Sequence, residues 1–162
     1  MNDRVINLVE NGLMAEVKTE CLFCKIGRRE IEPVVLAETE RLLVFLDRNP
    51  IREGHALIIP KAHYDYFDDA PLAVVNEITA LAQRLAKRLK EIYRVEKAAY
   101  MFSGGDIAHV HAHVLPLHKN SDLTSLRYVT APAQGEIVLG MAHLTQQAEA
   151  LAAVREKIGP LT

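Results

Sequence analysis

Imidazole and apolar side chains alternate along one segment of this 162-residue chain, His109-Val110-His111-Ala112-His113-Val114-Leu115. Because the side chains of a β-strand point alternately to its two faces, a strand here places the three histidines on one face and turns the residues between them toward the core. Neighbouring imidazoles on that face would lie about 6.5–7 Å apart, close enough to surround one phosphate or one metal ion. The alternation, next to the Gly104-Gly105 turn, therefore predicts a functional site.

Metal binding is one interpretation of this pattern. A His-x-His pair on a strand binds zinc in metal-dependent hydrolases, together with a further carboxylate or histidine from a neighbouring loop. Asp106 and His118 are near enough in the sequence to supply that group. The histidine segment by itself leaves a phosphate site and a metal site both open.

The apolar segments around the histidines predict an antiparallel sheet. Five of them are typical of short strands and lie at 34–37, 42–46, 55–59, 98–102 and 109–115. The first three are joined by short connections with turn-forming residues at 47–50 and 52–54. Parallel strands need longer crossovers, so these three are expected to form an antiparallel meander.

A long amphipathic helix is expected at 71–93, where Pro71 suits the first helical turn. Apolar side chains recur there at intervals of three and four, at Leu72, Val75, Ile78, Leu81, Leu85, Leu89 and Ile92. A second helix is expected at about 140–157, and residues 1–20 suggest a weak amphipathic helix broken near Gly12. The predicted fold class is α+β, with an antiparallel sheet of about five strands, one long helix and helical extensions at both ends.

The charge balance limits the partners of the protein. The chain has 19 Lys and Arg against 21 Asp and Glu, a formal net charge of -2. Proteins that bind nucleic-acid polymers or membrane surfaces usually have a basic excess, so neither is an expected partner. No apolar run reaches the roughly 18–20 residues that cross a bilayer, and charges interrupt the N-terminus where a secretory signal needs an apolar core. We expect one globular domain in the cytoplasm.

Two cysteines, Cys21 and Cys24, lie in a Cys-x-x-Cys arrangement. In a reducing compartment this spacing is typical of metal ligation or of a redox pair rather than of a structural disulfide. The spacing alone does not separate these two interpretations.

Three motifs together resemble the histidine triad (HIT) superfamily, in particular its bacterial Hint-like members. The family signature His-φ-His-φ-His-φ-φ, with φ apolar, matches residues 109–115 at each position. Residues 45–50 and 54–63 are similar to the family's sugar-binding strand and its GH…IPK.H segment, and residues 21–26 to the opening of many bacterial members. The motifs occur in the family's order and spacing.

The resemblance implies a HIT-like fold and divides the chain into a HIT domain at 21–120, an N-terminal extension at 1–20 and a C-terminal extension at 121–162. The three parts form a single globular domain overall. Members of the family often use the C-terminal region at a dimer interface, so a homodimer is the expected assembly.

The resemblance also implies a nucleotide hydrolase or transferase that acts on nucleoside phosphoramidates or dinucleoside polyphosphates. His111 matches the nucleophile, which attacks the α-phosphorus and forms a nucleotidyl-histidine that water then hydrolyses. A neutral imidazole near pH 7 is competent for this step. His113 and His55 match positions that hydrogen-bond the phosphate, where donors stabilise the charge that develops on its oxygens.

Further matches concern the bound purine nucleotide. Asp47 matches the carboxylate that accepts hydrogen bonds from both ribose hydroxyls. The apolar pocket around the base is matched by Leu22, Phe23, Ile26 and Phe45. Ser103 stands where better-known members use an Asn to bind phosphate, and Ala108 replaces a hydroxyl near the leaving group. These two replacements leave a purine-nucleotide-binding or scaffolding protein with vestigial catalysis as the alternative function.

A structural zinc site is the last implication of the resemblance. The ligands of that site in bacterial members are matched by Cys21, Cys24, His63 and His109. Two thiolates and two imidazoles suit tetrahedral Zn²⁺. Such an ion would pin the N-terminal segment to the sheet and would not be needed for the chemistry, in contrast to the zinc-dependent hydrolase considered above.

Overall fold

The computed structural model describes residues 4–8, 14–18, 20–103, 107–119, 122, 129–130, 138–139 and 145–161. In chain order the elements are β1 (Arg4–Leu8), β2 (Met14–Lys18), α1 (Leu22–Gly27), β3 (Val35–Glu38), β4 (Leu42–Leu46), β5 (Ala56–Pro60), α2 (Leu72–Tyr93), β6 (Lys97–Phe102), β7 (Ala112–Leu117), β8 (Val129–Thr130), β9 (Val138–Leu139) and α3 (Ala148–Ile158). The predicted α+β class, with a five-stranded antiparallel sheet and one long helix, is confirmed.

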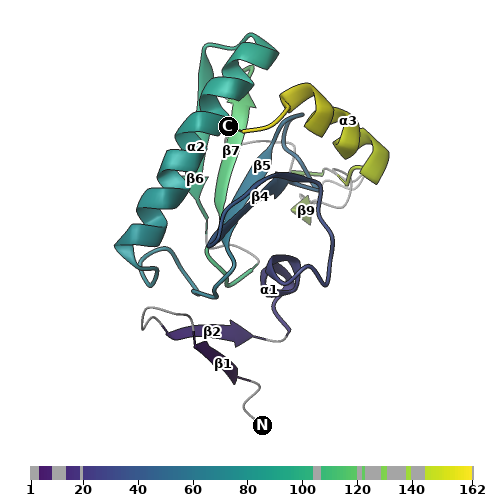
Figure 1. Cartoon of the computed structure of the whole chain (residues 1–162). Coiled ribbons are helices and arrows are strands. Elements are labelled where there is room, and N and C mark those ends of the chain that lie inside the picture. Colours follow the sequence, from purple (N-terminus) through teal and green to yellow (C-terminus); the bar gives the residue numbers. More distant parts are fainter. Residues whose placement is uncertain are drawn as a thin grey trace.

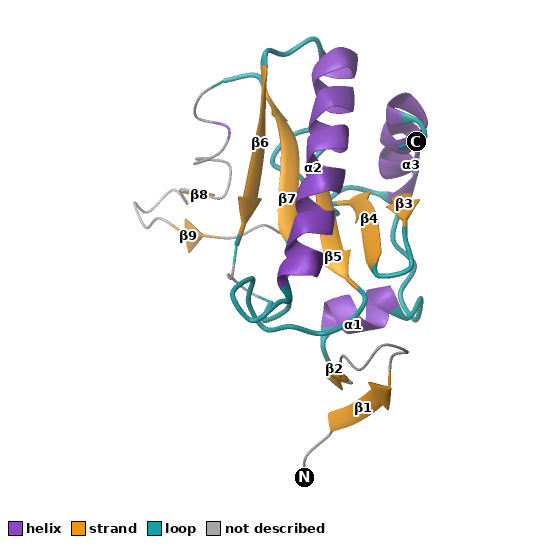
Figure 2. Ribbon diagram, turned by 60° about the vertical axis from the view of Figure 1, so that its left-hand side comes forward, coloured by secondary structure: helices purple, strands orange, loops and turns teal. Residues whose placement is uncertain are grey.

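The central sheet has the strand order β3-β4-β5-β7-β6, and each neighbouring pair is antiparallel. The first three strands form the predicted meander. The chain then crosses one face of the sheet in α2 before β6 and β7 complete it (Figures 1 and 2). As a result β7 is paired on both sides, with Leu57 of β5 and Met101 of β6 both opposite His113.

Side chains of the two strands β4 and β5 alternate between two cores. The core beneath α2 includes Leu42, Val44, Leu46, Ala56, Ile58, Ile78, Leu81, Leu85 and Leu89. The core beneath α1 consists of Phe23, Ile26, Leu43, Phe45, Leu57 and Ile59. Because both faces of the sheet are covered, all ten positions of the two strands are buried, which explains their uninterrupted apolar sequence.

The N-terminal part of the prediction is wrong. Residues Arg4–Leu8 and Met14–Lys18 are not helical but form the antiparallel pair β1-β2, in which Val5 lies opposite Val17. The Asn11-Gly12 dipeptide between them favours hairpins, and β-branched valines suit strands better than helices.

The C-terminal helical extension is confirmed as α3, which begins at Ala148 rather than near 140. Residues 140–144 lie outside the described part of the chain. Helix α3 packs beside α2 and β3, with Leu151 and Ile158 in the core beneath α2. Among the described residues, no helix combines the length and apolar character needed to cross a bilayer.

Candidate active site and metal centre

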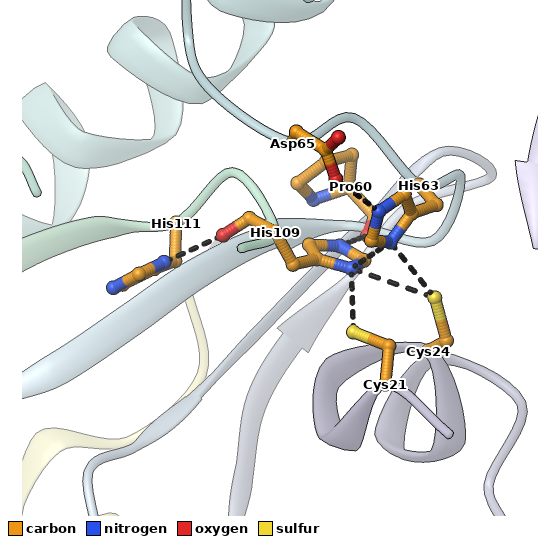
Figure 3. Close-up of polar contacts among 7 residues, drawn as sticks. All are labelled: Cys21, Cys24, Pro60, His63, Asp65, His109 and His111. Atoms are coloured by element: carbon orange, nitrogen blue, oxygen red, sulfur yellow. Dashed lines mark hydrogen bonds and ion pairs between the residues drawn. The ribbon is translucent and has the colours of Figure 1, made fainter. Parts of the chain in front are cut away.

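The alternation predicts a strand over the whole histidine segment, but only the second half of that segment is in a strand. Strand β7 begins at Ala112, so His113 is in the strand, whereas His109 and His111 lie in an irregular segment that bends at 107–109. The residues between the histidines are buried beneath α2, as predicted. The ring of His109 lies against the two cysteines, and His111 points away from them (Figure 3). The prediction that one strand face carries all three imidazoles is therefore wrong, because the bend turns the side chain of His109 in a different direction from that of His111.

The side chains expected to contact phosphate and ribose meet in space although they come from distant parts of the chain. They are Asp47 after β4, His55 before β5, Ser103 after β6, and His111 and His113 at the start of β7. Nε2 of His55 lies 2.9 Å from Nδ1 of His113. Oγ of Ser103 lies 2.8 Å from Nε2 of His113 and 3.2 Å from Nε2 of His111. The structure thus brings the five residues into one cluster.

Gly54 shapes the turn that brings His55 into this cluster. Its φ is +86°, and a Cβ at this position would lie 2.7 Å from Cε2 of Tyr93. Glycine is therefore required both by the backbone conformation and by the neighbouring ring. The N–H of Asp47 donates to the carbonyl of His55 at 2.9 Å, so backbone hydrogen bonding keeps the two residues side by side.

Burial keeps the imidazoles neutral. Desolvation lowers the pKa of His55 to about 4 and, with the neighbouring imidazoles, the pKa of His113 to about 3. Desolvation also lowers the pKa of His111 and outweighs its hydrogen bond to a backbone carbonyl, which acts in the opposite direction. Burial raises the pKa of Asp47. Near pH 7 the cluster therefore contains neutral imidazoles, the form that acts as a nucleophile.

The orientation of His111 follows from one backbone contact. Its Nδ1 lies 2.6 Å from the carbonyl oxygen of His109 (Figure 3). A carbonyl can only accept a hydrogen bond, so Nδ1 carries the proton of the neutral ring and Nε2 carries the lone pair. That lone pair faces Ser103 within the cluster.

The four apolar residues proposed for the base pocket differ in exposure. Phe23, Ile26 and Phe45 belong to the buried core beneath α1, whereas Leu22 is 43% exposed. The ring of Phe23 meets that of His111 edge-on, with centroids 5.1 Å apart. Phe23 therefore packs against the nucleophile, and of the four residues only Leu22 is largely open to solvent.

A second set of residues around His111 was not identified from the sequence. A cavity of about 220 Å³ opens beside His111 and Ser103, and its other walls are Tyr66, Phe67, Asp68, Phe102 and Val110. The rings of Phe67 and Phe102 stack at 5.5 Å. The aromatic residues at 64–67 were the available signal, but their position relative to β6 depends on the tertiary fold.

A cluster of two thiols and two imidazoles lies on the other side of His109. The donor atoms of Cys21, Cys24, His63 and His109 all lie within 4.8 Å of one another. Contacts include 3.2 Å from Sγ of Cys24 to Nδ1 of His63, and 3.4 Å from Sγ of Cys21 to Nδ1 of His109. The hydrogen bond with Cys24 is the main cause that lowers the pKa of Cys21, to about 3, and the thiolate is the form that binds metals.

Outer hydrogen bonds orient both imidazoles of this cluster. Nε2 of His63 lies 2.8 Å from Oδ1 of Asp65, and Nε2 of His109 lies 2.9 Å from the carbonyl of Pro60 (Figure 3). Since both partners accept, each Nε2 carries a proton and each Nδ1 a lone pair. The two Nδ1 atoms nevertheless face each other at 3.1 Å, close to the ~3.3 Å between two nitrogens on tetrahedral zinc. Such a pair of lone pairs is stabilised by a cation between them, so the donor set fits a metal ion.

Asp65 was also missed by the sequence interpretation, although a carboxylate two residues after a candidate ligand is a recognisable pattern. His118, considered as a further ligand of the histidine strand, follows the far end of β7 and packs against Tyr93 with ring centroids 6.2 Å apart. Asp106, the other such residue, lies outside the described part of the chain.

The sequence of this chain is similar to those of known proteins. The chain is 39% identical over 103 residues to adenosine 5'-monophosphoramidase HNT1 of Saccharomyces cerevisiae, a match that covers 63% of this chain and 65% of that protein. It is 30% identical over 105 residues to adenylylsulfatase HINT3 of Arabidopsis thaliana, covering 62% of this chain and 53% of that protein. The chain thus spans less than two thirds of the length of either enzyme.

A solved structure shares the fold. A zinc-bound histidine triad family protein from Mycobacterium smegmatis superposes with a TM-score of 0.62 at 23% identity, over 86% of this chain and 93% of that one. The HIT domain family model matches residues 28–120, more than half of the chain. With the fold and the clustered histidines, this match shows that the chain belongs to the HIT family.

Proposed function

We propose that this protein is a nucleotide hydrolase or transferase that acts at an α-phosphorus through a nucleotidyl intermediate on His111. The observation that carries the proposal is the 2.6 Å contact between Nδ1 of His111 and the carbonyl of His109. It leaves the Nε2 lone pair directed at a cluster of polar groups on a neutral ring, which is the arrangement that a nucleophilic imidazole needs.

The reaction has two displacement steps. Nε2 of His111 attacks the α-phosphorus and forms an N–P bond, while the bond from phosphorus to the leaving group breaks and the leaving group departs with its electron pair and takes up a proton. Water then attacks the same phosphorus, the N–P bond breaks, and a nucleoside monophosphate and the free imidazole result. The proton that this water releases to solvent balances the proton that the leaving group takes up from solvent. Donors from His113 and Ser103 would stabilise the charge on the phosphate oxygens, and His55 would support them from behind through its contact with Nδ1 of His113.

Two related enzymes support an adenylyl substrate. HNT1 is named for adenosine 5'-monophosphoramidase activity and HINT3 for adenylylsulfatase activity. Both names describe an adenosine monophosphate group with a different leaving group attached. We infer the same class for this chain, namely purine nucleoside phosphoramidates and related α-substituted nucleotides, with Asp47 on the ribose hydroxyls and Leu22, Phe23, Ile26 and Phe45 around the base. The cavity beside His111 offers space for the leaving group.

The test is a search for the covalent intermediate. Purified protein is mixed with adenosine 5′-phosphoramidate, quenched within its first turnover and examined by mass spectrometry. One adenylyl group on His111 is expected, and His111→Ala should lose the adduct and about 10⁴-fold or more of turnover.

His118→Ala is the matched control, because it removes a histidine that packs against Tyr93 at the far end of β7. Turnover by His111→Ala at the wild-type rate would overturn the proposal. Tight binding of adenosine nucleotides with neither an adduct nor turnover in the wild type would favour the alternative, a binding or scaffolding protein with vestigial catalysis.

We also propose that the cluster of Cys21, Cys24, His63 and His109 holds a structural zinc ion. The facing Nδ1 lone pairs and the oriented Nε2 protons support this assignment, and a histidine triad protein of the same fold is described as zinc-bound. Zinc here would tie helix α1 to the segments that carry His63 and His109, and would supply no chemistry at the phosphate. Metal analysis of the purified protein tests the assignment.

A metal ion among Asp47, His55 and His113 is the rival interpretation, because their donor atoms also lie within 4.8 Å of one another. Both nitrogens of His55 are occupied by hydrogen bonds, from the amide of Ile51 and to the ring of His113. A metal ion would have to replace these bonds, so the phosphate role is the better fit.

Homodimer formation through strand β6 is our proposal for the assembly. Strand β6 ends the five-stranded sheet, and Tyr100 on it is 38% exposed, with its hydroxyl 3.0 Å from that of Thr79 on α2. An edge strand with aromatic side chains is suited to pairing across a two-fold axis. Sedimentation of the wild type and of Tyr100→Glu tests this, since a monomeric wild type would exclude it.

A further inference from the structure

The imidazoles of the candidate active site are joined by a chain of hydrogen bonds that ends at a backbone group on each side. At one end the N–H of Ile51 donates to Nδ1 of His55 at 3.2 Å. At the other end the carbonyl of His109 accepts from Nδ1 of His111 at 2.6 Å. An amide can only donate and a carbonyl can only accept, so both ends have a defined direction.

The donor at the first end fixes the direction of the hydrogen bonds made by the rings of His55 and His113. Because Nδ1 of His55 accepts, the proton of this neutral ring is on Nε2, which donates to Nδ1 of His113 at 2.9 Å. His113 then carries its proton on Nε2, which donates to Oγ of Ser103 at 2.8 Å. Oδ2 of Asp47 also lies 3.4 Å from Nδ1 of His55, but the shorter contact with an obligatory donor decides the role of that nitrogen.

Ser103 joins this donor series to the nucleophile. Its oxygen accepts from His113, which leaves the hydroxyl proton directed to Nε2 of His111, 3.2 Å away. A hydroxyl has one donor and two acceptor positions, and this site uses it in both ways at once. All five hydrogen bonds then run in one direction, from the Ile51 amide to the His109 carbonyl. In none of them do two protons or two lone pairs face each other.

We propose that Ser103 is a positioning residue for the reaction of His111. Its hydroxyl holds the donor nitrogen of His113 and the attacking nitrogen of His111 in their working orientations. When a phosphate enters, the hydroxyl turns its proton from Nε2 of His111 to a phosphate oxygen and so releases the lone pair for attack. This inference rests on the proposed function, and adds to it a residue that acts through the two histidines before substrate is present.

The first test needs no substrate and therefore separates the two proposals. In protein with ¹⁵N-labelled histidine near pH 7, the ring nitrogen signals are expected to show His111 protonated on Nδ1, and His55 and His113 protonated on Nε2. The His113 Nε2 proton should be shifted downfield and protected from exchange by its bond to Ser103. In Ser103→Ala that protection should be lost and the His111 Nε2 signal should move, whereas Ser103→Thr should retain both.

The kinetic test measures formation of the adenylyl adduct. Misplacement of a reacting group commonly costs about 100-fold, so Ser103→Ala should slow adduct formation by about 10- to 100-fold with a KM change below about 3-fold, and Ser103→Thr should recover most of the rate. Thr79→Ala is the control, because it removes an exposed hydroxyl on α2. Circular dichroism checks that each variant is folded.

The outcomes are distinct. Imidazole signals that are unchanged in Ser103→Ala, or a His111 ring protonated on Nε2 in the wild type, would overturn the positioning role. So would an active wild type whose Ser103→Ala variant forms the adduct at the same rate. If the signals move as expected but the wild type forms no adduct, the hydrogen-bond chain stands and the proposed function fails.

Discussion

The carbonyl of His109 accepts a 2.6 Å hydrogen bond from Nδ1 of His111, although the two rings serve different clusters. The ring of His109 contacts the thiols of Cys21 and Cys24. That of His111 contacts Ser103 instead. One backbone segment therefore connects the candidate metal centre to the candidate nucleophile. We expect a change at the thiol cluster to affect the nucleophile only indirectly, through the position of this carbonyl.

Removal of the metal should lower stability far more than activity. Loss of a bound ion that ties α1 to the segments carrying His63 and His109 should reduce the melting temperature by about 10 °C or more, because the binding free energy contributes directly to folding. Turnover measured well below the new melting temperature should stay within about 3-fold. Calorimetry and turnover before and after a chelator, with zinc added back, check this. Immediate loss of turnover in folded protein would identify a catalytic metal instead.

Replacement of Asp65 should weaken metal binding without removing a ligand. Oδ1 of Asp65 accepts from Nε2 of His63 at 2.8 Å, and loss of such an outer partner typically lowers metal affinity by 10- to 100-fold. Competition with a chromophoric chelator measures the effect in Asp65→Ala. Asp69→Ala, an exposed carboxylate in the same loop, should bind zinc as the wild type does. Equal affinity in both variants would contradict the assigned role of Asp65.

Stability should fall as the pH decreases from about 6.5 toward 4. Burial lowers the pKa of His55 to about 4 and of His113 to about 3 in the folded state, whereas both titrate near 6.5 when unfolded. Between these values the unfolded chain binds more protons, so each histidine contributes a slope of about 1.4 kcal/mol per pH unit, and its stabilising effect is complete only above about pH 6.5.

Denaturant unfolding of wild type and His55→Gln across this range measures the contribution of His55, including its effect on the pKa of the neighbouring His113. The variant should show the shallower slope. Equal slopes in wild type and His55→Gln would contradict a lowered pKa of His55.

Gly54→Ala should be destabilising by about 1–3 kcal/mol, because an L-residue is strained at φ +86° and its Cβ would lie 2.7 Å from Cε2 of Tyr93. The turn leads directly into His55, so turnover should fall as well. Chemical denaturation and turnover assays measure both effects. Gly27→Ala provides the comparison and should cost less, because its φ is not positive and its Cβ would lie 3.3 Å from Cα of Lys61, a tight contact that needs only a small shift. A fully stable Gly54→Ala variant would show that the turn adapts.

The local sequence pattern was sufficient to predict most strands of the sheet and helix α2. Strand β4 and helix α2 lie within a residue of their predicted ranges, because continuous apolar runs and a 3.6-residue period leave few other ways to bury the same side chains. The pairing of β1 and β2 was missed because five-residue segments of mixed polarity show neither the 3.6-residue period of a helix nor the two-residue period of a strand clearly. The start of β7 was misplaced since histidine alternation resembles a strand even where the backbone bends.

The sequence by itself determined which chemistry the chain can carry, because residue types and their order are local properties. It indicated the three histidines, the Cys-x-x-Cys pair and the positions of Asp47, His55 and His63. The family resemblance implied two sets of groups, and only the tertiary structure decided the distances and contacts within each cluster. It also showed that Asp65 orients a candidate ligand and that Ser103 lies between two imidazoles. Distances between side chains on different strands depend on register and on the bend before β7, and the direction of each hydrogen bond depends on backbone groups that no sequence pattern specifies.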